Sequence, residues 1–219
     1  MPLELISFKT CPFVHRAAIT LAYKNVKHKL SFIDLANPPD WFLKISPLQK
    51  VPVLRVNDEI LFESAVINEY LDEITGAELQ PKDALARARN RAWIEVASNM
   101  LGNNFMMKMA GDRENYEKYR SRLISQMVRL EQQLGDGPWF NGEYFSLADT
   151  AFAPLFVHDA VADYRISVID PVTMPKVDAW AKRLMALPAV KDSVVPEFEA
   201  LFVAALEKAN TYSWTRIAA

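Results

Sequence analysis

Hydrophobic residues change their spacing along the chain, and the change predicts two structural halves that meet near residue 76. Before that point, short apolar runs typical of strands alternate with segments of helical spacing. The strand-like runs cover residues 3–8, 29–34, 53–56 and 60–62, and the helical segments cover 12–24 and 64–74. The three residues 57–59 between the last two strands have the length of a tight antiparallel hairpin.

The order of these segments predicts how the first half folds. A strand, a crossover helix and a second strand form a right-handed unit with parallel pairing. Residues 36–50, with three prolines, predict a long loop that holds at most a short helix at 41–44. The resulting order, strand–helix–strand–loop–strand–strand–helix, is the thioredoxin arrangement. We therefore predict a thioredoxin-like domain at 1–75.

The second half shows helical spacing and no convincing strand. A linker at 76–83 is predicted from Gly76 and Pro81. The apolar positions of two long helices are Leu85, Ala88, Ala92, Trp93, Val96, Met100 and Leu101, and then Tyr119, Leu123, Met127, Leu130 and Leu134. Gly135 is expected to end the second of them. Further helical segments at 146–161, 177–187 and 197–208 complete an all-helical domain at 84–219.

Two features of this second half are interpreted as structural. Ser146 and Asp149 have the spacing of a capping box at a helix start. Phe105, Met106 and Met107, late on the first long helix, are typical of a core, although an adaptable apolar site facing Cys11 is the alternative.

Composition excludes several classes of function. The 219 residues are 51% apolar and 24% charged, which is typical of a globular protein. The net charge of −2 provides no basic surface for nucleic acid. No secretory leader and no membrane-spanning run is visible. A single cysteine forms no intramolecular disulfide, which favours the reducing cytoplasm. His28 and His158 lack partners at metal-ligand spacing, so no metal is expected.

Cys11 is the first candidate for chemistry, because it lies between the first strand and the first helix. Pro12 suits the first helical position, so the sulfur is expected beside the unpaired amides and the positive end of the helix dipole. That position favours the nucleophilic thiolate over the thiol. His15 and Arg16 either add positive potential or face solvent. The alternative for Cys11 is a buried, inert thiol.

No second cysteine is available to resolve a disulfide formed at Cys11. The position three residues on, which completes a dithiol motif in oxidoreductases, is Val14. Turnover at Cys11 therefore requires an external thiol, and glutathione is the obvious one in a reducing cytosol.

Two further motifs are candidates for ligand binding. A cis bond between Val51 and Pro52 would let the Val51 backbone pair with an extended peptide, whereas a trans turn has no such role. Ser64 is a good helix N-cap, which alone explains it. The Ser64 hydroxyl and the amides of the helix start also suit a carboxylate, and Glu63 suits an ammonium group. A γ-glutamyl group carries both charges.

In combination these motifs resemble the glutathione transferases, and most closely the omega class and related cysteine-type members. The resemblance covers essentially the whole chain and rests on the shared order and spacing of its motifs. These are Cys11-Pro12-Phe13, Asn37-Pro38-Pro39-Asp40-Trp41-Phe42, Val51-Pro52-Val53-Leu54 and Phe62-Glu63-Ser64 followed by Glu69-Tyr70-Leu71-Asp72-Glu73.

The resemblance implies a role for each motif. Cys11 is expected to form a mixed disulfide with glutathione, in a groove lined by Phe13 and Leu35. Val51, before a cis Pro52, is expected to pair with the cysteinyl part, and Glu63 and Ser64 are expected to hold the γ-glutamyl end. The omega pattern has a lysine for the glycyl carboxylate where this chain has Pro38, and Lys50 is the candidate substitute.

The implied activity is thiol transfer or reduction, including that of mixed disulfides and dehydroascorbate, with a role in detoxification. The implied assembly is a homodimer. Three alternatives remain: conjugation of glutathione to hydrophobic electrophiles, a non-catalytic adaptor with the same fold, and a protein resembling the intracellular chloride channels. Lys24, Lys27 and Lys29 interrupt the apolar span that membrane insertion of the last kind requires.

Overall fold

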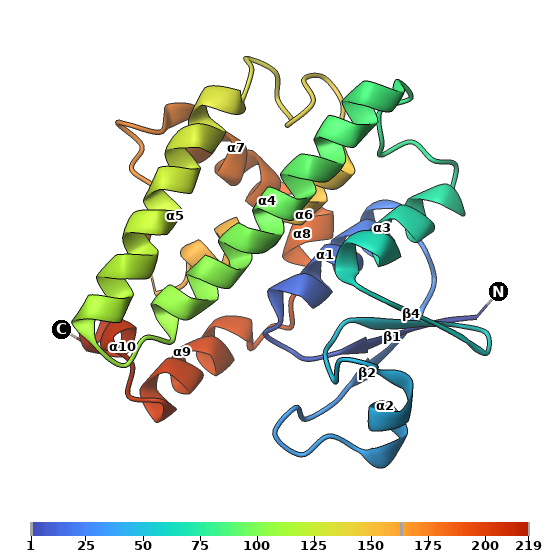
Figure 1. The fold of residues 1–219 in the computed structure, drawn as a ribbon, viewed down its shortest axis with the longest axis horizontal. Coiled ribbons are helices and arrows are strands. Elements are labelled where there is room, and N and C mark those ends of the chain that lie inside the picture. The colour runs from blue at the N-terminus through green and yellow to red at the C-terminus, as the bar shows by residue number, and fades with distance from the viewer. Residues whose placement is uncertain (1, 163, 219) are drawn as a thin grey trace.

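The computed structural model describes residues 2–162 and 164–218, so residue 1 of the first predicted half and residues 163 and 219 of the second lie outside the described part. The first half contains a four-stranded sheet in the order β2-β1-β3-β4 (Figure 1). Its strands are β1 (Leu3–Ser7), β2 (Lys29–Phe32), β3 (Val53–Val56) and β4 (Glu59–Phe62). β1 pairs in parallel with β2 and antiparallel with β3, which pairs antiparallel with β4. The predicted strand pairing is confirmed.

Three helices accompany the sheet: α1 (Pro12–Tyr23), α2 (Asp40–Ile45) and α3 (Ser64–Glu73). Figure 1 shows α1 and α3 between the sheet and the helical half, whereas α2 lies on the far side of the sheet. This is the thioredoxin-like arrangement predicted from the order of the apolar segments. The short α2 lies where the proline-rich loop was expected to hold a helical turn.

The second half is entirely helical in the part of the chain that the structure describes, as predicted. Its helices are α4 (Ala84–Lys108), α5 (Arg113–Gln133), α6 (Leu147–Asp159), α7 (Pro175–Ala186), α8 (Pro188–Lys191), α9 (Phe198–Lys208) and α10 (Tyr212–Ile217). The short α8 and α10 were not predicted. Across the described ranges, no helix has both the length and the hydropathy needed to cross a bilayer.

The core of the helical half is organised around α6, which packs against α1, α4 and α7. Every residue of α6 except Val157 is buried. The predicted capping box is present, with Asp149 accepting from the Ser146 backbone N–H at 2.9 Å. The same carboxylate accepts from the Trp180 ring N–H at 2.8 Å, so it also ties α7 to the start of α6.

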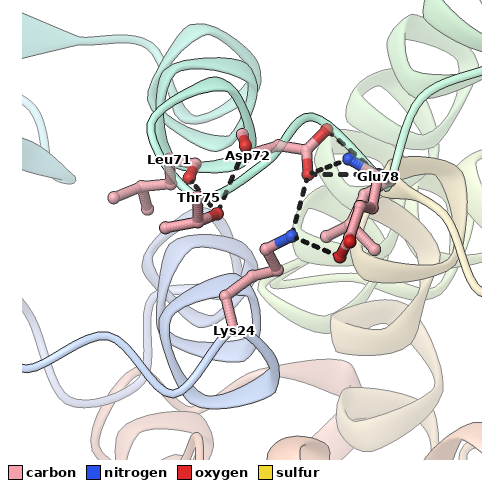
Figure 2. Close-up of polar contacts among 6 residues, drawn as sticks. Lys24, Leu71, Asp72, Thr75 and Glu78 are labelled. Atoms are coloured by element: carbon pink, nitrogen blue, oxygen red, sulfur yellow. Dashed lines mark hydrogen bonds and ion pairs between the residues drawn. The ribbon is translucent and has the colours of Figure 1, made fainter.

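A buried ion pair links α1, α3 and the segment that leads to α4 (Figure 2). The Lys24 ammonium lies 3.5 Å from the Asp72 carboxylate and 3.1 Å from that of Glu78. Asp72 also accepts from the backbone N–H groups of Glu78 and Leu79, at distances from 3.0 to 3.1 Å. Asp72 therefore fixes the chain as it leaves α3. The division at 76–83 stays a prediction.

Helix α1 is buried on two faces. Val14, Ala17 and Leu21 belong to the core beside the sheet, whereas Ile19 belongs to the core of the helical half. His15 and Arg16 are also buried. The His15 ring lies against a ring on α6 and one on α9, and Arg16 donates to Ala151 on α6 and Ser98 on α4. The alternative in which these two side chains face solvent is wrong.

The buried face of α4 differs from the predicted one over the first part of the helix. Leu85, Ala88 and Ala92, which were predicted on the buried face, are exposed, Leu85 to 61%. The buried positions near them are Asn90 and Ile94. Asn90 is buried because it donates to Gln80 and accepts from Asn141, and this polar contact is invisible to apolar spacing.

Two of the three apolar residues that were expected to be core late on α4 lie at the surface. Phe105 is 53% exposed and Met106 is 45% exposed, so the prediction is wrong for these two residues, and it is right for Met107, which is fully buried.

Candidate functional site

Cys11 lies at the end of the loop after β1, as the N-cap residue of α1, with Pro12 in the first turn as predicted. The Cys11 side chain is half-buried and packs against the core beside the sheet. Its thiol donates to the Val51 carbonyl oxygen across 3.8 Å. The sulfur is therefore brought next to the segment that was predicted to bind the peptide backbone of a ligand.

Burial raises the pKa of the Cys11 thiol above its ordinary value. The backbone N–H groups of Val14 and Phe13 and the charge of Arg16 all lower this pKa, but burial outweighs them. The sequence-based prediction of a lowered thiol pKa is therefore wrong for the ligand-free protein. The helix start provides the expected amides, but the surrounding apolar side chains penalise the thiolate more strongly.

A cavity of about 140 Å³ lies where the loop before β3 meets the start of α3. It is lined by Phe13, Ser46, Leu48, Lys50, Val51, Pro52, Phe62, Glu63 and Ser64. Every predicted glutathione-binding residue except Leu35 lies in this lining. Leu35 is 38% exposed in the turn after β2, so the structure does not bring it to the cavity.

The wall of this cavity formed by Val51 and Pro52 has the predicted cis peptide bond. The loop before it is fixed by Ser46, whose hydroxyl donates to the Lys50 carbonyl at 2.9 Å and accepts from the Lys50 N–H at 3.0 Å. Ser46 was not predicted to take part. Its spacing of four residues from Lys50, inside a proline-rich loop, is the signal that could have identified it.

The opposite wall is the start of α3, and it differs from the prediction in one respect. Glu63, not Ser64, is the N-cap residue, and it has a positive φ of 67°. A non-glycine residue with such a φ is uncommon and is often found at functional sites. Ser64 already occupies the first helical position, so its hydroxyl does not cap the helix. No side-chain cap bond is found at this helix start.

The Ser64 hydroxyl instead faces Arg16, whose Nη1 donates to it across 3.5 Å. The same nitrogen donates to the Ser98 hydroxyl at 2.8 Å, and Nε donates to the Ala151 carbonyl at 3.0 Å. Burial lowers the pKa of Arg16 to about 10, so the guanidinium stays charged at neutral pH. Helix α3 thus presents a hydroxyl, its first amides and a nearby buried cation, which together suit a carboxylate.

Lys50 provides a second cation, and it lies in the cavity lining. Its side chain is exposed, and the part of the chain that the structure describes offers it no ion-pair partner. The cavity lining therefore holds two groups for an anion, Lys50 and the start of α3 at Ser64, together with the Val51 backbone. Cys11 is not in this lining and adjoins it through the contact of its thiol with the Val51 carbonyl. This arrangement fits a short peptide that carries a carboxylate at both ends.

Comparisons with known proteins agree with this geometry. The family description "Glutathione S-transferase, N-terminal domain" matches residues 10–74, and "Glutathione S-transferase, C-terminal domain" matches residues 94–188. From rice (Oryza sativa subsp. japonica), "Probable glutathione S-transferase DHAR1, cytosolic" is 34% identical over 154 residues, which cover 69% of this chain and 68% of that protein.

A second rice relative, "Probable glutathione S-transferase DHAR2, chloroplastic", is 32% identical over 155 residues. The match covers 69% of this chain but only 53% of that protein, so the chain spans about half of its length.

Solved structures show the same fold. The Tau class glutathione S-transferase of mango (Mangifera indica L.) has a TM-score of 0.80 and 28% identity, over 95% of this chain and 98% of its own. Glutathione transferase Omega 3C of Trametes versicolor has a TM-score of 0.77 over 87% of this chain and 88% of its own; at 24% identity it shows the fold alone.

Proposed function

Because this chain belongs to the glutathione S-transferase family, we propose that it is a glutathione-dependent thiol transferase that acts through a mixed disulfide at Cys11. The observation that carries the proposal is the contact between the Cys11 thiol and the Val51 carbonyl. It places the one cysteine of the chain beside Val51, which lines the cavity whose groups suit the two carboxylates of glutathione.

The charged groups of the cavity set the orientation in which glutathione would bind, with its γ-glutamyl end at the start of α3 and its glycyl end at Lys50. Its γ-glutamyl carboxylate would accept from the Ser64 hydroxyl and the first amides of α3, and Glu63 would pair with its ammonium group. The Val51 backbone would pair with the cysteinyl part. Lys50 would hold the glycyl carboxylate, in place of the lysine that the omega pattern has at Pro38.

The chemistry is a pair of thiol–disulfide exchanges. The Cys11 thiolate attacks the glutathionyl sulfur of a mixed disulfide, a new S–S bond forms, and the other thiol leaves as a thiolate that takes up a proton. A free glutathione thiolate then attacks the glutathionyl sulfur bound to Cys11. Glutathione disulfide leaves, and the Cys11 thiolate is regenerated. No external oxidant or reductant is needed beyond glutathione itself.

Binding of glutathione also favours ionisation of Cys11 in this account. In the ligand-free protein the Cys11 S–H donates to the Val51 carbonyl, which stabilises the thiol form. A peptide that pairs with the Val51 backbone competes for this acceptor. The N–H groups of Phe13 and Val14 and the charge of Arg16 already lower the thiol pKa, and losing the Val51 acceptor leaves burial to oppose them.

The test is an activity panel with two substrates, a glutathione mixed disulfide and an aromatic chloride electrophile. We expect the wild-type protein to reduce the mixed disulfide and Cys11→Ala to lose this activity. Because Cys11 is half-buried and isosteric with serine, Cys11→Ser provides the structural control, with an unchanged fold and no exchange. Undiminished exchange in Cys11→Ala would reject the mechanism.

Conjugation of glutathione to electrophiles is the second candidate. The raised pKa of Cys11 favours it, because a protonated thiol can donate a hydrogen bond to the sulfur of bound glutathione. The likeness to the mango Tau class structure also supports it. In that case Cys11→Ser keeps or gains activity toward the aromatic chloride, since serine is the stronger donor, and the mixed disulfide is a poor substrate for both proteins.

The remaining expectations are proposals with simple tests. Dehydroascorbate reduction and a role in detoxification follow from the family of the chain and need a direct assay. Light scattering tests the homodimer, and cell fractionation tests the cytoplasmic location. Retention on immobilised glutathione separates the enzyme from a non-catalytic adaptor, because an adaptor that has lost the site would not be retained.

A further inference from the structure

Cys11 ends a short turn between β1 and α1. The turn consists of residues 8–11, and we call it the Cys11 turn. Its backbone hydrogen bond runs from the Cys11 N–H to the Phe8 carbonyl oxygen at 3.1 Å. Any displacement of the Cys11 turn moves the sulfur relative to the helix amides that lower its pKa and to the Val51 carbonyl.

The middle of the Cys11 turn contacts the start of α9. The Lys9 ammonium lies 2.6 Å from the Glu197 carboxylate, and Glu197 is the N-cap residue of α9. The same ammonium lies 5.8 Å from the centre of the Phe32 ring, at the end of β2. Figure 1 shows the start of α9 next to the loop between β1 and α1. The Cys11 turn is therefore linked to a helix of the other half of the molecule.

The next residue of α9 reaches the Cys11 turn from the interior. The Phe198 ring packs edge-on against the His15 ring, with 5.2 Å between the ring centres, and both side chains are buried. His15 Nε2 lies 3.5 Å from the Lys9 carbonyl oxygen. Because a carbonyl oxygen only accepts, Nε2 carries the proton of this bond. Glu197 thus holds the side chain of Lys9, and Phe198 supports its backbone through His15.

The ion pair between Lys9 and Glu197 contributes little to global stability. The two side chains are 42% and 46% exposed, and pairs with such exposure stabilise a fold only weakly. A weak contact still has a local effect, because a turn can open without unfolding of the whole protein. Displacing a reacting group by about 1 Å can slow a reaction by about 100-fold. The contact therefore matters more for the position of the sulfur than for the fold.

We propose that Glu197 is a positioning residue for Cys11, which it holds in place from the start of α9 through Lys9. This inference rests on the proposed function and adds a residue of the helical half to it. Glu197 lies outside the lining of the candidate glutathione cavity, so it acts on the attack by the Cys11 sulfur and not on the affinity for glutathione.

The first test is the kinetics of Glu197→Ala with a glutathione mixed disulfide as substrate. We expect kcat to fall about threefold, the factor typical of an exposed ion pair, with an unchanged KM. Glu207→Ala is the matched control, because it removes the same charge from an exposed position at the other end of α9, and it should match wild type. Without any substrate, hydrogen exchange of the Cys11 amide, measured by NMR, should accelerate about threefold in Glu197→Ala.

A charge swap separates the contact from the charge of Lys9 itself. Lys9→Glu and Glu197→Lys should each lower kcat more than Glu197→Ala does, because like charges then face each other. The double variant restores an ion pair of reversed sign, so its kcat should be at least about threefold above that of Glu197→Lys. The dipole of α9 disfavours lysine at position 197 equally in these two proteins, so it cancels in the comparison.

An unchanged kcat in Glu197→Ala would overturn the proposal, even if the Cys11 amide exchanges faster. A rise in KM with constant kcat would also overturn it, since Glu197 would then act on binding. No recovery in the double variant would assign the effect to the charge of Lys9. The proposed function fails separately, if Cys11→Ala retains exchange activity. Hydrogen exchange of the Cys11 amide in the charge-swap variants then still decides whether α9 holds the Cys11 turn.

Discussion

Acidification should weaken the packing of α1 against the helical half, because a neutral histidine is buried there. His15 is 2% exposed, and its ring lies 5.4 Å from that of His158 and 5.2 Å from that of Phe198. Burial lowers the pKa of His15 from 6.5 to about 4, although a hydrogen bond with the Lys9 carbonyl opposes the shift. Burial also lowers the pKa of His158, as do the charges of His15 and Lys108.

The size of the effect follows from the two pKa values of His15. Between about pH 6.5 and 4 the unfolded chain binds a proton at His15 that the folded protein does not, so the free energy of unfolding falls as the pH falls. A shift of about 2.5 units corresponds to about 3 kcal/mol over the whole range, of which about 1.4 kcal/mol is lost by about pH 5.5. His158 adds to the loss in the same direction.

Urea unfolding followed by tryptophan fluorescence measures this loss. His15→Phe keeps an aromatic ring against Phe198 and removes the titration, so its free energy of unfolding should fall by about 1 kcal/mol less than that of wild type between about pH 7.5 and 5.5. His28→Phe, at an exposed histidine, is the control and should follow wild type. Parallel pH profiles for wild type and His15→Phe would refute the reasoning.

Three further predictions concern the buried ion pair between α1 and α3 and the candidate glutathione site. Asp72→Ala should lower the free energy of unfolding in urea by about 3–5 kcal/mol, because it leaves the buried Lys24 ammonium with only the Glu78 carboxylate. Glu78→Ala, at a side chain that is 76% exposed, should lower it by less than about 1 kcal/mol. Equal losses for the two variants would contradict this account. Lys50→Ala should raise the Kd of glutathione about fivefold in calorimetry at low salt, for one exposed charge contact, and an unchanged Kd would place the glycyl carboxylate elsewhere. Iodoacetamide alkylation of ligand-free Cys11 should keep accelerating above about pH 9, because its pKa is raised, whereas a plateau below about pH 7 would show an activated thiolate.

The sequence predicted the parts of the fold that follow from local rules. Short apolar runs identified the strands, and the order of the segments identified their parallel and antiparallel pairs. The capping box at Ser146 and the cis bond before Pro52 were predicted because each depends on a few adjacent residues. The cavity residues between Lys50 and Ser64 were predicted from the resemblance to glutathione transferases.

The errors have a shared physical origin, which is packing between segments distant in sequence. Helical spacing identified the face of α1 against the sheet, but His15 and Arg16 are buried by contacts with α4, α6 and α9, which are distant in sequence. The raised pKa of Cys11 likewise depends on surrounding side chains, which the position at a helix start does not reveal. Ser64 is a good cap by composition, but the positive φ of Glu63 moves it one position into the helix.

The most direct test of the central claim is the mass of the intact protein after incubation with glutathione disulfide near pH 8. Because the chain has a single cysteine, any adduct reports on Cys11 alone. We predict one glutathionyl group on the wild-type protein, removed by excess glutathione, and none on Cys11→Ser. A wild-type protein that binds glutathione in calorimetry but never gains this mass would contradict the claim.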